Sequence, residues 1–193
     1  MINDFTSKLL AINLYNQGIT KTRNNDLIGA LNDFNRAIEI DSSFKEAYTN
    51  RGVVKENIQD FSGALSDYSK VLDIDPKYFQ AYFNRAEVKF KIKDFIGAIE
   101  DVKKALYIQP NNKEAYLNFG LYHAHLHQFQ SAILIYNKCL LLDPLYLKAM
   151  FNRGVAYAHL RKISESLDDL NMVLKLNPNY PEINKQIEII KNL

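Results

Sequence analysis

The stretch AYTNRGVV, residues 47–54, returns with few changes as AYFNRAEV at residues 81–88 and as AMFNRGVA at residues 149–156. The three copies begin at Ala47, Ala81 and Ala149, so the second interval is twice the first, and the spacings are one period and two. A fixed period of this length is typical of repeat architectures, in which one supersecondary unit is stacked many times. The period therefore predicts a repeat protein.

The composition is that of a globular protein without a charge bias. Of 193 residues, 47% are hydrophobic, and 24 Lys and Arg are interleaved with 22 Asp and Glu, so no basic stripe suggests nucleic acid. The single cysteine, Cys139, excludes an internal disulfide framework. The N-terminal sequence lacks the features of a signal peptide, and no apolar run reaches the ~18 residues of a membrane span. We expect a soluble cytoplasmic protein that binds neither nucleic acid nor membranes.

The chain divides into five units of equal length in which glycine and proline fall into columns. The units cover residues 11–44, 45–78, 79–112, 113–146 and 147–180. The eighth place holds Gly18, Gly52, Gly120 and Gly154, with Ala86 in the third unit, and the nineteenth holds Gly29, Gly63 and Gly97. Pro76, Pro110, Pro144 and Pro178 share the thirty-second place, where proline separates one unit from the next helix. We expect residues 1–193 to form a single domain of five repeats with a capping helix at residues 181–193.

Each unit is predicted to form two helices joined by a short polar turn. In residues 45–78, AYTNRGVVKEN and FSGALSDYSKVLDI have helical periodicity, and IQD lies between them. Aspartate before the second helix should act as its N-cap at Asp26, Asp60 and Asp94. Glycine inside a helix costs about 1 kcal/mol relative to alanine, so the eighth place needs a packing reason. We expect two helix backbones to cross there, with small partners in the twentieth place at Ala30, Ala64, Ala98, Ala132 and Ser166.

These columns resemble the tetratricopeptide-repeat family over residues 11–180. The marks are the small residue of the eighth place, the alanine of the twentieth, the proline of the thirty-second, and Tyr48, Tyr82 and Tyr116 in the fourth. The resemblance implies an all-α, right-handed superhelical solenoid of five antiparallel helix-turn-helix repeats, with first helices lining a concave groove. The family favours tyrosine in the eleventh place, where this chain has Lys21, Lys55 and Lys89. That departure predicts a wetter contact between neighbouring first helices.

Both ends of the chain are predicted to extend the array. Residues 181–193 begin a sixth unit and then stop, with Ile183, Ile187 and Ile190 at helical spacing. These isoleucines should face the last hairpin while the polar remainder solvates the open end of the array. Residues 3–10 should extend the first helix backwards.

No catalytic or cofactor motif is present, so we expect neither an enzyme nor a bound cofactor. In HAHLH, His123 and His127 are four residues apart on one predicted helical face, while His125 lies on another and His159 follows one unit later. Because a zinc site needs a complete ligand set, we interpret these histidines as polar groove and packing residues, and expect no metal. Cys139 shares its column with small apolar residues and is interpreted as core filler.

An arginine and an aspartate vary together among the units. Arg51, Arg85 and Arg153 fill the seventh place where Asp67, Asp101 and Asp169 fill the twenty-third, and the fourth unit has Phe119 and Ile135 instead. A partly buried charge is normally kept only with its partner. We therefore predict a salt bridge between the two helices of each hairpin.

Asparagine occupies the sixth place of all five units. The second, sixth, ninth and thirteenth places share one helical face, so this asparagine ladder should line the groove at Asn16, Asn50, Asn84, Asn118 and Asn152. Each amide offers a donor and an acceptor to a peptide backbone, as in the similar ladder of O-linked N-acetylglucosamine transferase. Around it lie apolar residues that favour a partly apolar ligand: Phe83, Phe90, Leu117, Leu121, Phe151 and Val155. The alternative, that these asparagines only tie adjacent helices together, stays open.

The pattern as a whole predicts a non-enzymatic adaptor that binds an extended protein segment in its groove. The alternative is a structural protein that self-assembles into homo-oligomers through its groove or its ends. A clamp for the acidic tails of chaperones is disfavoured, because the matching places read Tyr15 and Ile19, then Asn50, then Gln80 and Asn84.

Overall fold

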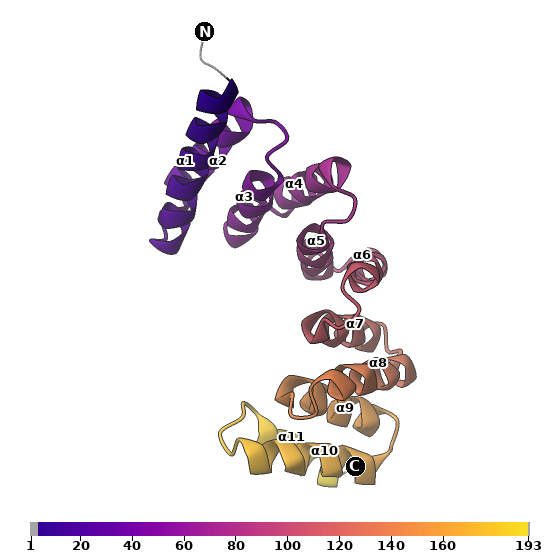
Figure 1. The fold of residues 1–193 in the computed structure, drawn as a ribbon. Helices are drawn as coiled ribbons and strands as arrows, with labels where there is room; N and C mark the ends of the chain where they lie inside the picture. The colour runs from indigo at the N-terminus through magenta and orange to yellow at the C-terminus, as the bar shows by residue number, and fades with distance from the viewer. Residues whose placement is uncertain (1–3, 193) are drawn as a thin grey trace. The chain divides into compact units, whose positions relative to one another are not determined.

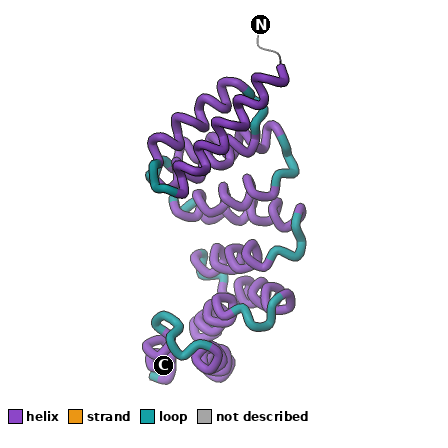
Figure 2. The backbone as a smooth tube through the Cα atoms, turned by 60° about the vertical axis from the view of Figure 1, so that its left-hand side comes forward, coloured by secondary structure: helices purple, strands orange, loops and turns teal. Residues whose placement is uncertain are grey.

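The computed structural model describes residues 4–192 as a series of α-helices joined by loops, with no strand among these residues (Figures 1 and 2). The helices pair in chain order into antiparallel hairpins. Their bounds are α1 Asp4–Arg23, α2 Leu27–Ile40, α3 Lys45–Asn57, α4 Phe61–Ile74, α5 Phe79–Lys91, α6 Phe95–Ile108, α7 Lys113–His125, α8 Phe129–Leu142, α9 Leu147–His159, α10 Ile163–Leu176 and α11 Ile183–Lys191.

The helices begin in register with the sequence period. From the second unit onward, each first helix begins at the first residue of its unit, and each second helix begins sixteen residues later. The helix α1 begins at Asp4, so the predicted backward extension is present over residues 4–10, and residue 3 lies outside the described residues. The chain falls into two compact units, Met1–Ile108 and Gln109–Leu193. That residues 1–193 act as a single domain stays a prediction.

Each compact unit has its own apolar core. In Met1–Ile108 the buried side chains include Tyr68, Val71 and Val88. In Gln109–Leu193 they include Leu170 and Val173, together with the three isoleucines of α11, which are Ile183, Ile187 and Ile190. The predicted inward stripe of the terminal helix is therefore confirmed. The helix begins two residues later than Pro181, because Glu182 adopts a left-handed backbone conformation (φ 57°) and ends the preceding turn.

In three units the glycine of the eighth place makes room for an aromatic ring, and in the fifth unit Gly154 faces Leu170. A Cβ atom added to Gly52 would lie 2.7 Å from Cε1 of Tyr68, and one added to Gly18 would lie 2.6 Å from Cε1 of Phe34. Both rings come from the twenty-fourth place of the same unit and are fully buried. The closest approach is therefore between the glycine and a large side chain, which the prediction of small partners in the twentieth place missed.

The glycine of the nineteenth place belongs to the N-cap of the second helix. The Asp60 carboxylate accepts a hydrogen bond of 2.9 Å from the Gly63 N–H, and Asp26 and Asp94 accept equivalent bonds from Gly29 and Gly97. The three predicted N-caps are thereby confirmed. A Cβ atom on Gly63 would overlap the Asp60 carboxylate, so the cap and the glycine require each other.

Asp60→Ala is expected to lower the free energy of unfolding by about 1 kcal/mol, because it leaves an N–H group at the start of α4 without its acceptor. Chemical denaturation of the purified chain measures the loss. Ser66→Ala, which changes an exposed residue of the same helix, is the matched control and should have little effect. Equal stabilities of the Asp60→Ala variant and the native chain would contradict the capping role.

Candidate functional site

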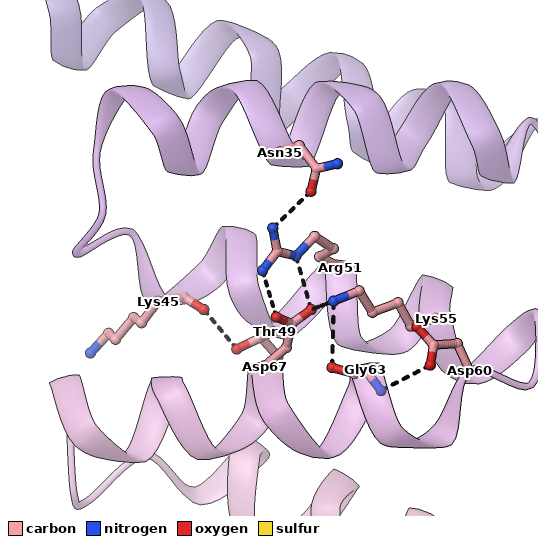
Figure 3. A network of polar contacts seen from close by, with 8 residues as sticks. All are labelled: Asn35, Lys45, Thr49, Arg51, Lys55, Asp60, Gly63 and Asp67. Carbon is pink, nitrogen blue, oxygen red and sulfur yellow. Dashed lines mark hydrogen bonds and ion pairs between the residues drawn. The ribbon is translucent and has the colours of Figure 1, made fainter.

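Each arginine of the seventh place forms two hydrogen bonds to the aspartate of its own hairpin. The Arg51 guanidinium donates from Nε to Asp67 Oδ2 at 2.9 Å and from Nη2 to Asp67 Oδ1 at 2.6 Å (Figure 3). The same pair of bonds joins Arg85 to Asp101, at 2.8 Å each, and Arg153 to Asp169, at 2.7 and 2.6 Å. The predicted salt bridge within the hairpin is confirmed in all three units.

The third nitrogen of each guanidinium reaches the preceding hairpin, a contact that the sequence reasoning missed. Nη1 of Arg51 donates to Asn35 Oδ1 at 2.7 Å, as Figure 3 shows. The equivalent acceptors are Ser69 for Arg85 and Asn137 for Arg153. The sequence signal for this contact is in the twenty-fifth place. That place holds a small polar residue in each unit that precedes an arginine, whereas it holds Lys103 in the unit that precedes Phe119. Each arginine therefore also ties consecutive hairpins together.

The lysines of the eleventh place complete these charge clusters. Lys55 Nζ lies 2.9 Å from Asp67, Lys89 lies 2.7 Å from Asp101, and Lys21 lies 2.6 Å from Asp33. These ammonium groups face the aspartate of their own hairpin, and the wetter contact between first helices stays a prediction. The Asp101 carboxylate raises the pKa of the Arg85 guanidinium above its ordinary value, and Asp169 does the same for Arg153.

The asparagines of the sixth place lie in different environments. Asn16 is exposed, and Asn84 is buried with its Oδ1 accepting from Gln80 at 2.8 Å. Asn50 donates to the Tyr15 hydroxyl at 2.9 Å and to the Glu46 carbonyl at 3.0 Å. The two in the second compact unit, Asn118 and Asn152, are half-buried. The bond from Asn50 to Tyr15 joins neighbouring first helices, so a helix-tying role holds at that position.

In Gln109–Leu193, three of the predicted site residues line one pocket of about 310 Å³. These are Leu121 on α7 and Asn152 and Val155 on α9, which occupy the ninth, sixth and ninth places of their units. Asn152 Nδ2 donates to the Lys148 carbonyl at 2.8 Å, and that bond does not use its Oδ1. An adjoining pocket of about 330 Å³ shares Val155 with the first. Apolar side chains, the Asn152 amide and histidine rings therefore line the same pocket.

The other predicted apolar residues pack against their own neighbours. Leu117 and Phe151 contact the core of the second compact unit, and Phe151 lies 5.2 Å from the Tyr180 ring, measured between centroids. In the first compact unit, Phe83 stacks on Phe79 with 5.7 Å between centroids. The ring of Phe90 lies 5.5 Å from that of Phe95.

The histidines are arranged differently from the prediction. The residue His127 lies beyond the end of α7 with φ 56°, so it does not share a helical face with His123. His123 Nδ1 instead lies 2.5 Å from Gln128 Oε1, whereas His125, His127 and His159 line the 310 Å³ pocket. The His159 ring stacks on Phe129 with 4.2 Å between centroids. Among residues 4–192, no group of three His, Cys, Asp or Glu side chains could hold a metal ion.

Cys139 is buried in the second core, as its column predicted. Its Sγ donates to the Lys113 carbonyl at 3.2 Å, and burial raises the pKa of its thiol to about 11. A thiol of that pKa is a poor nucleophile near neutral pH, so the residue acts in packing. Over the described part of the chain, no helix is both long enough and apolar enough to span a bilayer.

Comparisons with known proteins agree with this geometry. A family model described as tetratricopeptide repeat matches residues 45–78 and 79–112, and a second model of the same description matches residues 117–181. Together the matches cover more than half of the chain. No curated protein matches the sequence.

Several solved structures have the same fold. The crystal structure of YrrB, described as a TPR protein with an unusual peptide-binding site, is 23% identical, with a TM-score of 0.79 over 92% of each chain. A tetratricopeptide repeat protein from Parabacteroides merdae is 18% identical, with a TM-score of 0.86 over 94% of this chain and 72% of that one. MamA from Desulfovibrio magneticus is 21% identical, with a TM-score of 0.82 over 89% and 97%. At these identities the likeness shows the fold, and it confirms the predicted all-α class.

Proposed function

The chain belongs to the tetratricopeptide-repeat family, whose members are protein-interaction scaffolds, and from that premise we propose that it is a non-enzymatic adaptor for an extended, partly apolar peptide. The observation that carries the proposal is the convergence of Leu121, Asn152 and Val155 on one pocket of about 310 Å³. A site of mostly apolar lining with a few convergent polar groups is the usual form of a binding pocket.

The chemistry of the pocket favours a peptide rather than a small polar metabolite. The apolar walls accept a hydrophobic side chain, and the amide of Asn152 can accept from a backbone N–H of the same peptide. Arg153 on α9 is already paired with Asp169, so it contributes rigidity to its own hairpin rather than a ligand contact. The description of YrrB as having a peptide-binding site supports the same use of the fold.

The proposal is most direct for Asn152, which lines the pocket, and least direct for Asn84. A buried amide that already accepts from Gln80 has to be uncovered before it can meet a ligand. Phe83, Phe90, Leu117 and Phe151 are then supports for the groove wall, because each packs on a neighbouring side chain. In the first compact unit, Asn16 lines a separate polar pocket, and Asn50 is bonded to Tyr15.

Val155→Asp is expected to lower the affinity for a selected peptide at least about tenfold, because it places a carboxylate in an apolar pocket. The peptide comes from a random display library panned against the purified chain, and isothermal calorimetry measures its affinity. Asn152→Ala, tested on the same peptide, should weaken binding about fivefold, as expected for one lost hydrogen bond.

Leu134→Asp is the matched control, since it makes the same kind of change on an exposed leucine of α8 away from the pocket. It should leave the affinity unchanged. Equal affinities of the Val155→Asp and Leu134→Asp variants would sink the proposed site. Concentration-dependent oligomers that block selection of any peptide would favour the self-assembly alternative, and light scattering detects them.

A further inference from the structure

Another pocket, of about 460 Å³, lies in Met1–Ile108 and takes no part in the proposed peptide site. Its lining comes from α5, α6 and the loop that joins α4 to α5. The side chains that define it are Lys77, Lys103, Lys104, Tyr82 and Tyr107. Its volume falls within the range of about 300–1,000 Å³ that is usual for ligand sites.

Two tyrosines form walls of different rigidity. Two cations lie near the Tyr82 ring: the Arg85 guanidinium is 5.7 Å and the Lys104 ammonium 5.5 Å from its centroid. The first of these cations is itself fixed by its two bonds to Asp101. The other ring, Tyr107, is 87% exposed, which is costly for a large aromatic side chain. One wall is therefore fixed, and the other is available to close over a ligand.

The lysines place positive charge at the rim of an apolar pocket. A lysine side chain lays its methylene stem along apolar surface and keeps its ammonium group in water, so the stems can line the pocket while the charges surround its mouth. Two carboxylates of the neighbouring segments are paired with other cations. Asp75 pairs with Lys45 at 2.6 Å, and Asp101 pairs with Arg85 and Lys89. Asp73 acts on Arg85, whose pKa it helps to raise.

This combination is particular to the third repeat. The twenty-fifth, twenty-sixth and twenty-ninth places hold Lys103, Lys104 and Tyr107 here, but Ser69, Lys70 and Asp73 in the second repeat, and Asn137, Lys138 and Leu141 in the fourth. In the second repeat the twenty-fifth residue accepts a hydrogen bond from the arginine of the next hairpin. Lysine cannot accept, and the seventh place of the next hairpin is accordingly Phe119. In the third repeat, therefore, the exposed cation Lys103 stands where the second repeat has a hydrogen-bond acceptor, Ser69.

We infer that this pocket binds an acidic peptide segment that carries an aromatic side chain between its carboxylates. The aromatic side chain enters between Tyr82 and Tyr107, where ring contacts favour it. The flanking carboxylates meet the ammonium groups of Lys77 and Lys104 at the rim. The site is a second docking surface on the chain. It selects an acidic segment with an aromatic side chain over a basic segment or a purely apolar one.

The test titrates the full-length, ¹⁵N-labelled chain with the peptide acetyl-Asp-Asp-Phe-Asp-Asp-amide and follows backbone amide shifts. Shifts should concentrate at residues 76–82 and 103–108 and weaken as salt is raised. Lys77→Glu combined with Lys104→Glu should lower the affinity at least about tenfold, because it reverses two rim charges. Tyr107→Ser should lower it about fivefold by removing one aromatic wall.

Three comparisons decide the result. Lys138→Glu changes the same place in the next repeat and should leave the affinity unchanged. The peptides acetyl-Asp-Asp-Ala-Asp-Asp-amide and acetyl-Lys-Lys-Phe-Lys-Lys-amide should bind more weakly than the acidic aromatic peptide. Equal binding of the alanine peptide, or an equal loss in the Lys138→Glu variant, would overturn the inference. So would binding to phosphatidylserine vesicles that requires Lys77 and Lys104 while the acidic peptide leaves the spectrum unchanged.

Discussion

Replacing Arg85 and Lys89 together by alanine is expected to lower the free energy of unfolding by about 3–5 kcal/mol. Asp101, between α5 and α6, is almost fully buried and is held by both cations, at 2.8 Å from Arg85 and 2.7 Å from Lys89. Removing both leaves a buried carboxylate without a counter-charge, which is among the costliest single defects in a folded chain. Urea denaturation followed by circular dichroism measures the loss.

Each single substitution should cost less than the double substitution, because either cation alone still neutralises Asp101. Arg85→Ala should cost about 1.5–3 kcal/mol, since it also removes charge-assisted hydrogen bonds, and Lys89→Ala about 1 kcal/mol. The double substitution should therefore exceed the sum of the two. Lys70→Ala, at an exposed lysine of α4, is the control and should cost almost nothing. Strict additivity of the two losses would show that the cations act independently.

The sequence predicted the fold well because the period carries most of the information. Once the copies of AYTNRGVV set the period and its register, the helix starts at Lys45, Phe79 and Lys113 followed from the columns. The pairing of Arg85 with Asp101 was also predictable, because both charges disappear in the one repeat that has Phe119 and Ile135. Covariation among repeats within one chain thus served as contact information.

The errors arose where the residues of one repeat position were interpreted without the residues that contact them in the folded hairpin. Glycine in the eighth place indicated close packing, but the partner was identified only by the coordinates, because the large residue lies sixteen positions away at Phe34 or Tyr68. Lysine in the eleventh place, as at Lys55, was judged against the family preference, and its contact with the nearby Asp67 was missed. Each error concerned which side chains meet, not which helices form.

The candidate binding residues were the least predictable. Helical periodicity placed Leu121, Asn152 and Val155 on one face, and the structure brings them to one pocket. The same periodicity gave no reason for Asn84 to be buried and Asn16 exposed, because burial at the sixth place depends on the side chains of the neighbouring hairpin. The predicted shared face of His123 and His127 was wrong for a related reason. The helix α7 ends at His125, so a spacing of four residues does not place His127 on the same helical face.

The eighth and twenty-fourth places form a matched pair whose volumes compensate. Glycine faces a ring in three repeats, at Phe34, Tyr68 and Tyr136, whereas the third repeat has Ala86 with Val102. The added methyl of alanine and the smaller valine together keep the space filled, and both residues are buried. Cores tolerate such coordinated changes because density, rather than the identity of any one residue, decides stability.

Gly120→Ala is accordingly expected to destabilise the chain by about 1–3 kcal/mol, although alanine is the better helix former. Its Cβ atom would overlap the Tyr136 ring, with Cδ1 at 2.6 Å, and the ring is fully buried between α7 and α8. Tyr136→Val alone should cost about 3 kcal/mol by leaving a cavity. In the Tyr136→Val background, however, Gly120→Ala should restore about 1 kcal/mol, because it recreates the pair that the third repeat already uses. Thermal and urea unfolding of the four chains forms the cycle, with Tyr136→Phe as a control that keeps the ring. If Gly120→Ala costs the same in both backgrounds, the glycine is present for a reason other than the ring.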